Sequence, residues 1–443
     1  MNKKLAVLCL VAAATTSAVF AQEGPTPEGI PHLDHVWVIM MENHGFNQLR
    51  NNPNAPFINK FADSANAATN YFAVGHPSLT NYLEVTGGSN FGVRNDNSPD
   101  WHNSACTPNI VSGTPSLEGA ANICPITGSG TDASTPAIDC TNETSGPPCL
   151  WDLVGPNSAD IPAARTVGKS IADQLHERGM TWKSYQESLP PIADPNTQKS
   201  AADLVNNADG FFSNLTNFTP FIADGSFSSW SVQGVNIPAV TTEAQAHSDV
   251  VSLYAVKHNP FVYFQSVQEG GLKNVVGFVG PGGLYADLGS GNVPNFSFIA
   301  PNQCNDQHGR GNAGPFCNFD AVDNGTQSGL NDTNILMGDI TVHQIVGAIK
   351  QSQAWQEGQN AIVLLWDEND YTATPNQVLV VVDTNYGVKG MQSGNFYTHF
   401  SLLKSLEAGF ELRCLNHACD ASTKVMSDLF ASADGANNTA NQR

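Results

Sequence analysis

The sequence has few charged residues, and those it has are mostly acidic. Only 13% of its 443 residues are charged, with 19 Lys and Arg against 40 Asp and Glu, which gives a formal net charge of −21. A surface this acidic repels the phosphate backbone of nucleic acids. Nucleic-acid binding is therefore not expected, and an anionic substrate needs a local positive centre, which a metal ion can provide.

Several signatures of known sites are also missing. The sequence has no GxxxxGK[ST] loop, no strand-linked GxGxxG and no CxxC pair. This argues against a phosphate-binding loop, a dinucleotide-binding fold and a thiolate zinc knuckle. Beyond residue 21 no apolar run is long enough to cross a bilayer, so we expect no stable membrane span.

The first 21 residues resemble an export signal. Lys3 and Lys4 precede an apolar run over 5–14, and small residues at 19–21 suit a cleavage site. We therefore expect a secreted or periplasmic protein, whose residues 22–443 form a single domain. After removal of this segment eight cysteines remain, at positions 106, 124, 140, 149, 304, 317, 414 and 419. The even number fits disulfides, and eight cysteines allow about 105 different pairings. The close spacing of 140/149, 304/317 and 414/419 favours local pairs, and the four cysteines within 102–149 indicate a Cys-rich insertion.

Short apolar runs alternate with helical patterns along the chain. The runs cover 35–41, 261–264, 296–300, 361–366 and 378–382, and the helical patterns cover 164–178, 242–257, 334–356 and 400–409. Continuous apolar runs are typical of strands buried on both faces. The alternation predicts an α/β fold, a doubly wound and mostly parallel sheet sandwiched by helices.

Acidic and polar side chains follow three of these predicted strands. Glu42 and Asn43 come after the first, Asp367 and Glu368 after 361–366, and Asp306 and His308 after 296–300. Ligands of open α/β sheets bind at the carboxyl ends of the strands, so these side chains should meet at one edge. Each acid taken alone reads equally as a loop residue or a helix cap. Clustered carboxylates repel one another, and a divalent metal ion is the usual remedy.

A candidate nucleophile lies in the stretch 75–88, GHPSLTNYLEVTGG, where Leu79, Tyr82, Leu83 and Val85 suit the buried face of a helix. Ser78 follows Pro77, and a hydroxyl at a helix N-terminus lies near the positive end of the dipole. Asn81, one turn on, is placed to donate to a bound oxyanion. No GxSxG surrounds Ser78, so an α/β-hydrolase elbow is not supported, and the stretch taken alone reads as a helix cap.

Six motifs follow one another along the chain: Glu42-Asn43, HPSLTNYL at 76–83, KHNPF at 257–261, PNQCNDQH at 301–308, WDEND at 366–370 and YTHFSLLKSLE at 397–407. In this order they resemble the motifs of the phosphoesterase family of bacterial and fungal acid phosphatases and bacterial phospholipases C, in the alkaline-phosphatase superfamily. The resemblance spans about residues 33–410 and implies an alkaline-phosphatase-like fold. Gly45 and Asn47 depart from the commoner ENxSFD form of the first motif.

The resemblance implies a role for each matching residue. Ser78 matches the nucleophile, which becomes transiently phosphorylated, and Asn81 lies beside it. The histidines that match the phosphate pocket are His258, His308 and His399. The matching ligands of a divalent metal are Glu42, Asn43, Ser78, Asp367 and Glu368. Asp306, His308 and His399 match positions that hold a second metal in two-metal relatives, or that bind phosphate oxygens and the leaving group.

The resemblance favours an exported, metal-dependent acid phosphatase that acts on phosphoric monoesters through a phosphoserine. Protonated histidines suit an acidic optimum, because their ordinary pKa is about 6.5. The alternative is a phospholipase C that hydrolyses phospholipid head groups. The longer phospholipases of the family carry extra carboxy-terminal domains, and the short stretch after the last motif favours the phosphatase. A binding protein without turnover and a metal-free serine hydrolase are the alternatives from other classes.

Overall fold

The structure is a computed structural model. It describes residues 23–93, 95–100, 122–130, 166–189, 230–232, 235–237, 253–309, 332–370 and 376–430. The predicted signal at 1–21, most of the Cys-rich insertion and most of the predicted helix at 242–257 lie outside the described residues. Among the described helices, none is both long enough and apolar enough to cross a membrane.

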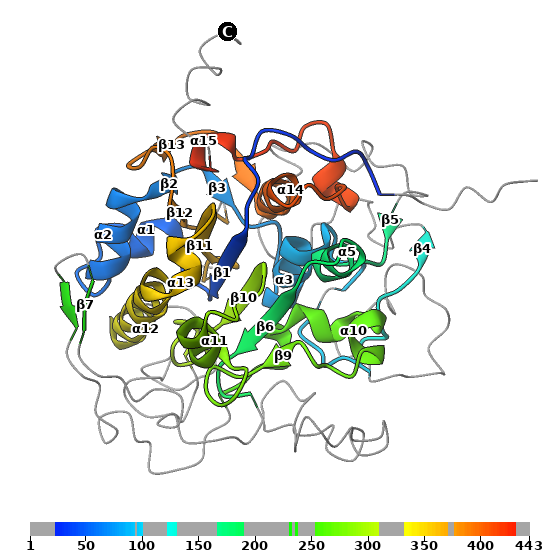
Figure 1. The fold of residues 1–443 in the computed structure, drawn as a ribbon, viewed down its shortest axis with the longest axis horizontal. Coiled ribbons are helices and arrows are strands. Elements are labelled where there is room, and N and C mark those ends of the chain that lie inside the picture. The colour runs from blue at the N-terminus through cyan, green and yellow to red at the C-terminus, as the bar shows by residue number, and fades with distance from the viewer. Residues whose placement is uncertain are drawn as a thin grey trace, which may run out of the picture.

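An eight-stranded sheet forms the centre of the molecule (Figure 1). In spatial order its strands are β13 (Gln392–Ser393), β2 (Asn66–Ala68), β12 (Val380–Thr384), β11 (Asn360–Trp366), β1 (His35–Met41), β10 (Phe296–Ala300), β6 (Trp182–Gln186) and β9 (Val275–Val276). From β11 to β9 all neighbours are parallel, whereas β12 is antiparallel to β11 and to β2. Strands β1 and β11 are almost wholly buried, as their apolar runs predict.

Three short pairs lie outside this sheet. They are β3 (Tyr71–Phe72) with β14 (Tyr397–Thr398), β4 (Ser129–Gly130) with β5 (Thr166–Val167), and β7 (Trp230–Val232) with β8 (Val235–Ile237). The β3–β14 pair matters for the site, because each strand runs into a segment that carries a site residue.

Helices cover both faces of the sheet (Figure 1). One face carries α2 (Pro56–Ser64), α11 (Leu284–Ser290), α12 (Asp332–Gln351) and α13 (Gln353–Gln356), and the other carries α3 (Ser78–Gly87), α5 (Ile171–Glu177) and α14 (His399–Gly409). The shorter elements are α1 (Phe46–Leu49), α10 (Gln265–Glu269), α15 (Ser427–Phe430) and the 3₁₀ turns η3 (Val256–His258), η4 (Pro260–Tyr263) and η5 (Asn416–Cys419). The predicted α/β sandwich is thus confirmed, with one continuous buried core between sheet and helices.

The structure corrects one sequence prediction and adds a detail to another. The run at 261–264 was expected as a strand but begins as η4, because Pro260 fixes a helical φ at its first position and its apolar side chains pack on Trp182 and Phe298. Strand β12 is antiparallel, which a continuous apolar run cannot reveal.

One predicted disulfide lies within the described residues. Cys414 and Cys419 are bonded, as their close spacing predicts. Their sulfurs pack against Gly24, whose backbone exchanges hydrogen bonds with this loop: Gly24 N donates to Cys414 O at 2.9 Å. The pairs 140/149 and 304/317 each have a member outside the described residues.

Candidate active site

The carboxyl ends of three adjacent parallel strands meet at one edge of the sheet. Strand β1 lies between β10 and β11, and the chain leaves these strands at Glu42, at the loop with Asp306, and at Asp367. Backbone bonds tie the three exits together, since Glu42 N donates to Asp306 O at 2.9 Å and Asp367 N donates to Met41 O at 3.0 Å. All these carboxylates are buried, as the strand order requires.

Ser78 opens α3 directly over this edge. Its Oγ lies 3.0 Å from Glu42 Oε2, 3.5 Å from Asn43 Oδ1 and 3.5 Å from Glu368 Oε1. Asn43 adopts a positive φ of 44°, a left-handed conformation that asparagine tolerates better than most residues, and its N–H donates to Asp367 Oδ1 at 3.1 Å. The structure thus brings together the five residues expected to hold the first metal, which are Glu42, Asn43, Ser78, Asp367 and Glu368.

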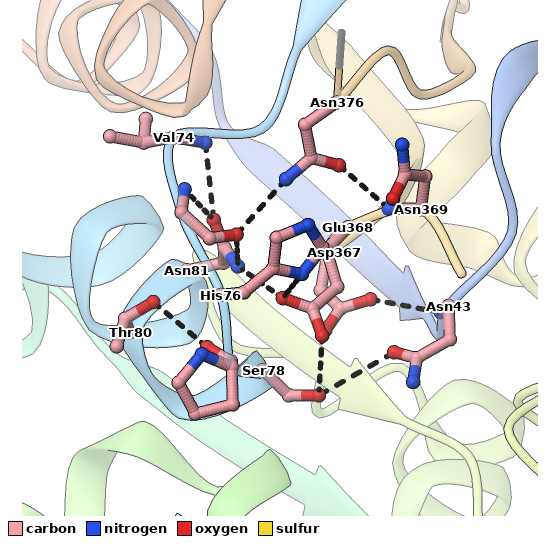
Figure 2. Close-up of polar contacts among 12 residues, drawn as sticks. Asn43, Val74, His76, Ser78, Thr80, Asn81, Asp367, Glu368, Asn369 and Asn376 are labelled. Atoms are coloured by element: carbon pink, nitrogen blue, oxygen red, sulfur yellow. Dashed lines mark hydrogen bonds and ion pairs between the residues drawn. The ribbon is translucent and has the colours of Figure 1, made fainter. Parts of the chain in front are cut away.

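Asn81 holds the loop before Ser78 and reaches Glu368 (Figure 2). Its Oδ1 accepts hydrogen bonds from Val74 N at 3.2 Å and Gly75 N at 3.1 Å, and its Nδ2 donates to Gly75 O at 2.9 Å and Glu368 Oε2 at 3.0 Å. The amide is therefore committed to protein groups. In this arrangement it positions the loop and the carboxylate; the expected role as a donor to an oxyanion stays a prediction.

His76 also holds Glu368, with Nδ1 2.8 Å from Glu368 Oε2 (Figure 2). This oxygen therefore has two partners, His76 and Asn81, while the other carboxylate oxygen of Glu368 faces Ser78. The bonds fix which oxygen points at the serine.

His258 joins two of the carboxylates. Its Nε2 lies 3.0 Å from Glu42 Oε1 and its Nδ1 3.3 Å from Asp306 Oδ2, while its ring stacks on Tyr82 with centroids 5.3 Å apart. Burial lowers the pKa of His258, and the nearby Lys257 and His308 lower it further. This direction opposes the protonated histidine expected for an acidic optimum.

His308 and Asp306 lie beside His258, as expected. His308 N donates to Asp306 Oδ1 at 2.7 Å, and its ring lies 5.8 Å from that of His258. One ligand atom each from Glu42, His258 and His308 fall within 4.8 Å of one another, a spacing that a metal ion fits.

His399 is the first residue of α14. Its Nε2 donates to the backbone oxygen of Asp367 at 2.6 Å, and its Nδ1 lies 3.0 Å from the hydroxyl of Tyr71 on β3. Both ring nitrogens are thus engaged by the protein, and burial lowers the pKa of His399 to about 4. In this arrangement His399 positions Asp367, and the second site of Asp306, His308 and His399 stays a prediction.

The donor set fits a hard divalent cation. Burial raises the pKa of Glu42, and the charges of Asp367 and Glu368 raise it further; burial likewise raises the pKa of Asp367, with Glu368 next in effect. Asp367 Oδ2 is buried and has no hydrogen-bond partner among the residues that the structure describes. Carboxylate and amide oxygens are the preferred ligands of such cations, whose charge relieves this repulsion.

Sequence reasoning did not assign three residues of this site. Lys257 reaches Ser78 Oγ at 3.5 Å and Asp96 Oδ2 at 3.0 Å, and His76 binds Glu368. Lys257 and His76 both lie inside motifs named above, Lys257 directly before His258 and His76 two residues before Ser78. This closeness in sequence to predicted site residues could have identified them. Asp96 belongs to none of the motifs and carried no such signal.

Comparison with known proteins agrees with these motifs. The model of the phosphoesterase family matches residues 51–413. A phosphate-repressible acid phosphatase of Penicillium chrysogenum is 22% identical over 385 residues, covering 85% of this chain and 59% of the relative. An acid phosphatase of Aspergillus fumigatus is 22% identical over 352 residues, covering 78% and 48%. The chain thus spans only 48–59% of the length of these relatives.

Two further similarities are shorter or weaker. A phosphatidylinositol-3-phosphatase of Mycobacterium tuberculosis is 31% identical over 113 residues, covering 25% of this chain and 37% of the relative. A solved structure from Vibrio parahaemolyticus, described as a protein in the alkaline phosphatase superfamily, is 10% identical with a TM-score of 0.41, covering 88% of this chain and 69% of that one. Because the family model matches most of the length of this chain, the chain belongs to the phosphoesterase family.

Proposed function

We propose that this chain is a metal-dependent phosphoric monoester hydrolase of the acid phosphatase type, acting through a phosphoserine at Ser78. The observation that carries the proposal is the buried Ser78 hydroxyl at the N-terminus of α3, with oxygens of Glu42, Asn43 and Glu368 within 3.5 Å. Two relatives named as acid phosphatases support the phosphatase part of this proposal. We further propose that it works outside the cytoplasm, from the signal-like segment at 1–21.

The residues that would hold the metal are those at the strand ends. They are Glu42, Asn43, Ser78, Asp367 and Glu368. A bound divalent cation supplies positive charge that lowers the pKa of a hydroxyl and balances the charge of a phosphoryl group.

The serine performs the transfer in two steps. Ser78 Oγ attacks phosphorus, an Oγ–P bond forms, the bond from phosphorus to the alcohol oxygen breaks, and the net proton moves from the serine to the alcohol. Water then attacks the same phosphorus, which releases phosphate and restores the hydroxyl. Glu42 Oε2, 3.0 Å away, is the nearest acceptor for the serine proton, and the positive end of α3 favours the charge that develops.

The alternative function, a phospholipase C, differs from the proposed one in its substrate, which is a phosphodiester. The Phe-rich segment at 211–227, a candidate lipid-facing rim, lies outside the described residues. The relatives named above are all phosphatases. The monoester is therefore the substrate class we propose.

The test is hydrolysis of p-nitrophenyl phosphate by wild type and Ser78→Ala, each with EDTA and with metal added back. Ser405→Ala is the matched control, since Ser405 is also buried and its hydroxyl donates to Ser401 O at 2.7 Å and accepts from Met426 N at 2.8 Å. We expect Ser78→Ala to lose about a thousandfold or more in kcat. The chelated wild type should lose activity and regain it with metal, and Ser405→Ala should stay active.

The intermediate needs its own measurement. Acid quenching during turnover, followed by mass spectrometry, should find phosphate on the peptide with Ser78. Activity that survives both Ser78→Ala and chelation contradicts the proposal. Hydrolysis of phosphatidylcholine without hydrolysis of monoesters favours the phospholipase C.

A further inference from the structure

A buried ammonium group lies against the candidate nucleophile. Lys257 Nζ is 3.5 Å from Ser78 Oγ, 3.0 Å from Asp96 Oδ2 and 3.4 Å from His308 Nε2. The side chain is only 12% exposed. An ammonium group has three N–H donors; Asp96 and His308 take two of them, and the third faces Ser78.

The partners of Lys257 hold it in place. Asp96 binds the ammonium through Oδ2 and accepts from Leu79 N through Oδ1 at 3.1 Å, so one carboxylate links the lysine to the first turn of α3. His308 Nδ1 lies 2.7 Å from the backbone oxygen of Gly309, which can only accept, so the proton is on Nδ1 and Nε2 accepts from Lys257. The charge therefore stays beside Ser78 without a substrate.

The side chains around Lys257 are mostly acidic, so its positive charge matters for binding an anion. Glu42, Asp306, Asp367 and Glu368 are each at most 1% exposed, and the chain carries a net charge of −21. A phosphate group approaching Ser78 meets this negative charge. Lys257 is a positive charge that the chain itself supplies within 3.5 Å of the attacking oxygen.

We propose that Lys257 is a catalytic residue that binds the non-bridging oxygens of the phosphoryl group during transfer to Ser78 and thereby selects monoesters over diesters. The inference rests on the proposed function and specifies its substrate class. A phosphorus bonded to Ser78 Oγ carries its oxygens within hydrogen-bond reach of an ammonium already 3.5 Å from Oγ. A monoester dianion offers one more negative oxygen than a diester monoanion, so a fixed cation favours the monoester.

Asp96 is a positioning residue in this proposal. It touches no reacting atom, but it binds both Lys257 and Leu79. Asp96→Asn keeps the shape and removes the charge that holds the ammonium. We expect it to weaken the preference for monoesters in the same direction as loss of Lys257, with a smaller effect.

The experiment compares p-nitrophenyl phosphate with bis(p-nitrophenyl) phosphate for wild type, Lys257→Met, Lys257→Gln and Lys257→Arg, all loaded with metal. Lys183→Met is the matched control, because Lys183 is also largely buried and paired with one acid, Asp287, on the β6–α11 side. Circular dichroism and thermal unfolding show which variants fold. If Lys257→Met does not fold, Lys257→Gln answers the same question with a neutral side chain.

The expected result is a change in selectivity. Monoester kcat/KM should fall about a hundredfold in Lys257→Met, the cost of removing one transition-state donor. The ratio of kcat/KM for the monoester to kcat/KM for the diester should fall at least about tenfold, because the variant loses the positive charge that attracts the extra negative charge of the monoester. Lys257→Arg should keep most of the ratio, and Lys183→Met should match wild type. A neutral variant with an unchanged ratio overturns the inference, whether or not both rates fall.

Binding of inorganic phosphate, measured by isothermal titration calorimetry, separates this inference from the proposed function. If wild type hydrolyses neither ester, the proposed function fails, and the titration alone decides on Lys257. A loss of phosphate affinity of about tenfold or more in Lys257→Met supports the phosphoryl contact. Equal affinity in wild type and Lys257→Met overturns it.

Discussion

Replacing Asn81 with alanine distinguishes two roles for this residue. As a donor to the oxyanion it would act only in the transition state, and its loss would lower kcat without changing stability. As the structure has it, Asn81 accepts from Val74 N and Gly75 N and donates to Gly75 O and Glu368 Oε2. Its loss should then lower the free energy of unfolding as well.

The magnitude follows from these bonds. The bond to the charged Glu368 contributes about 1.5–3 kcal/mol, and leaving the buried Gly75 N–H without its acceptor costs about 1–3 kcal/mol. Gly75 O retains a partner, because Asn376 Nδ2 donates to it at 3.0 Å. We therefore expect Asn81→Ala to lower the free energy of unfolding by about 4 kcal/mol, a large part of the usual total of about 5–15 kcal/mol.

The assay is urea unfolding followed by circular dichroism, on protein treated with EDTA and on metal-loaded protein. Thr86→Ala is the control on the same helix, since Thr86 is equally buried but bonds only to the helix backbone, at Tyr82 O. Its loss should be about 1 kcal/mol. A loss in Asn81→Ala no larger than that of Thr86→Ala, together with a lowered kcat, would refute the positioning role and support the oxyanion donor.

Two further predictions concern stability away from the site. Burial lowers the pKa of His343 to about 4, so between pH 6.5 and 4 the unfolded chain binds more protons and stability falls as the pH drops. Urea unfolding at pH 7 and pH 4 measures how much free energy of unfolding the protein loses between the two pH values. This loss should be smaller in His343→Phe than in wild type, by up to about 3 kcal/mol, and an equal loss in both proteins would contradict the prediction. Replacing Cys414 and Cys419 by serine opens a loop closed over a separation of 5 residues, which should cost about 2 kcal/mol; an unchanged urea midpoint would count against that figure.

Much of the site could be predicted from the sequence because it depends on local order along the chain. Apolar runs ending in Glu42, Asp306 and Asp367 predict parallel strands whose polar ends share one edge. The structure gathers these residues, with Asp306 O bonded to Glu42 N and Met41 O to Asp367 N. The disulfide between Cys414 and Cys419 could also be predicted, because two cysteines close in sequence favour a local pair.

Only the tertiary structure decided which partners the site side chains have. The bonds from Lys257 to Asp96, from Asn81 to Glu368 and from His399 to Tyr71 join residues 161, 287 and 328 positions apart. The antiparallel direction of β12 depends on such distant pairing too, because an apolar run is the same read either way. The sequence by itself determined which residues reach the active-site edge, since strand ends are local features; the folded chain determined which of them face Ser78 and which hold others in place, since hydrogen-bond partners are chosen by distance in space.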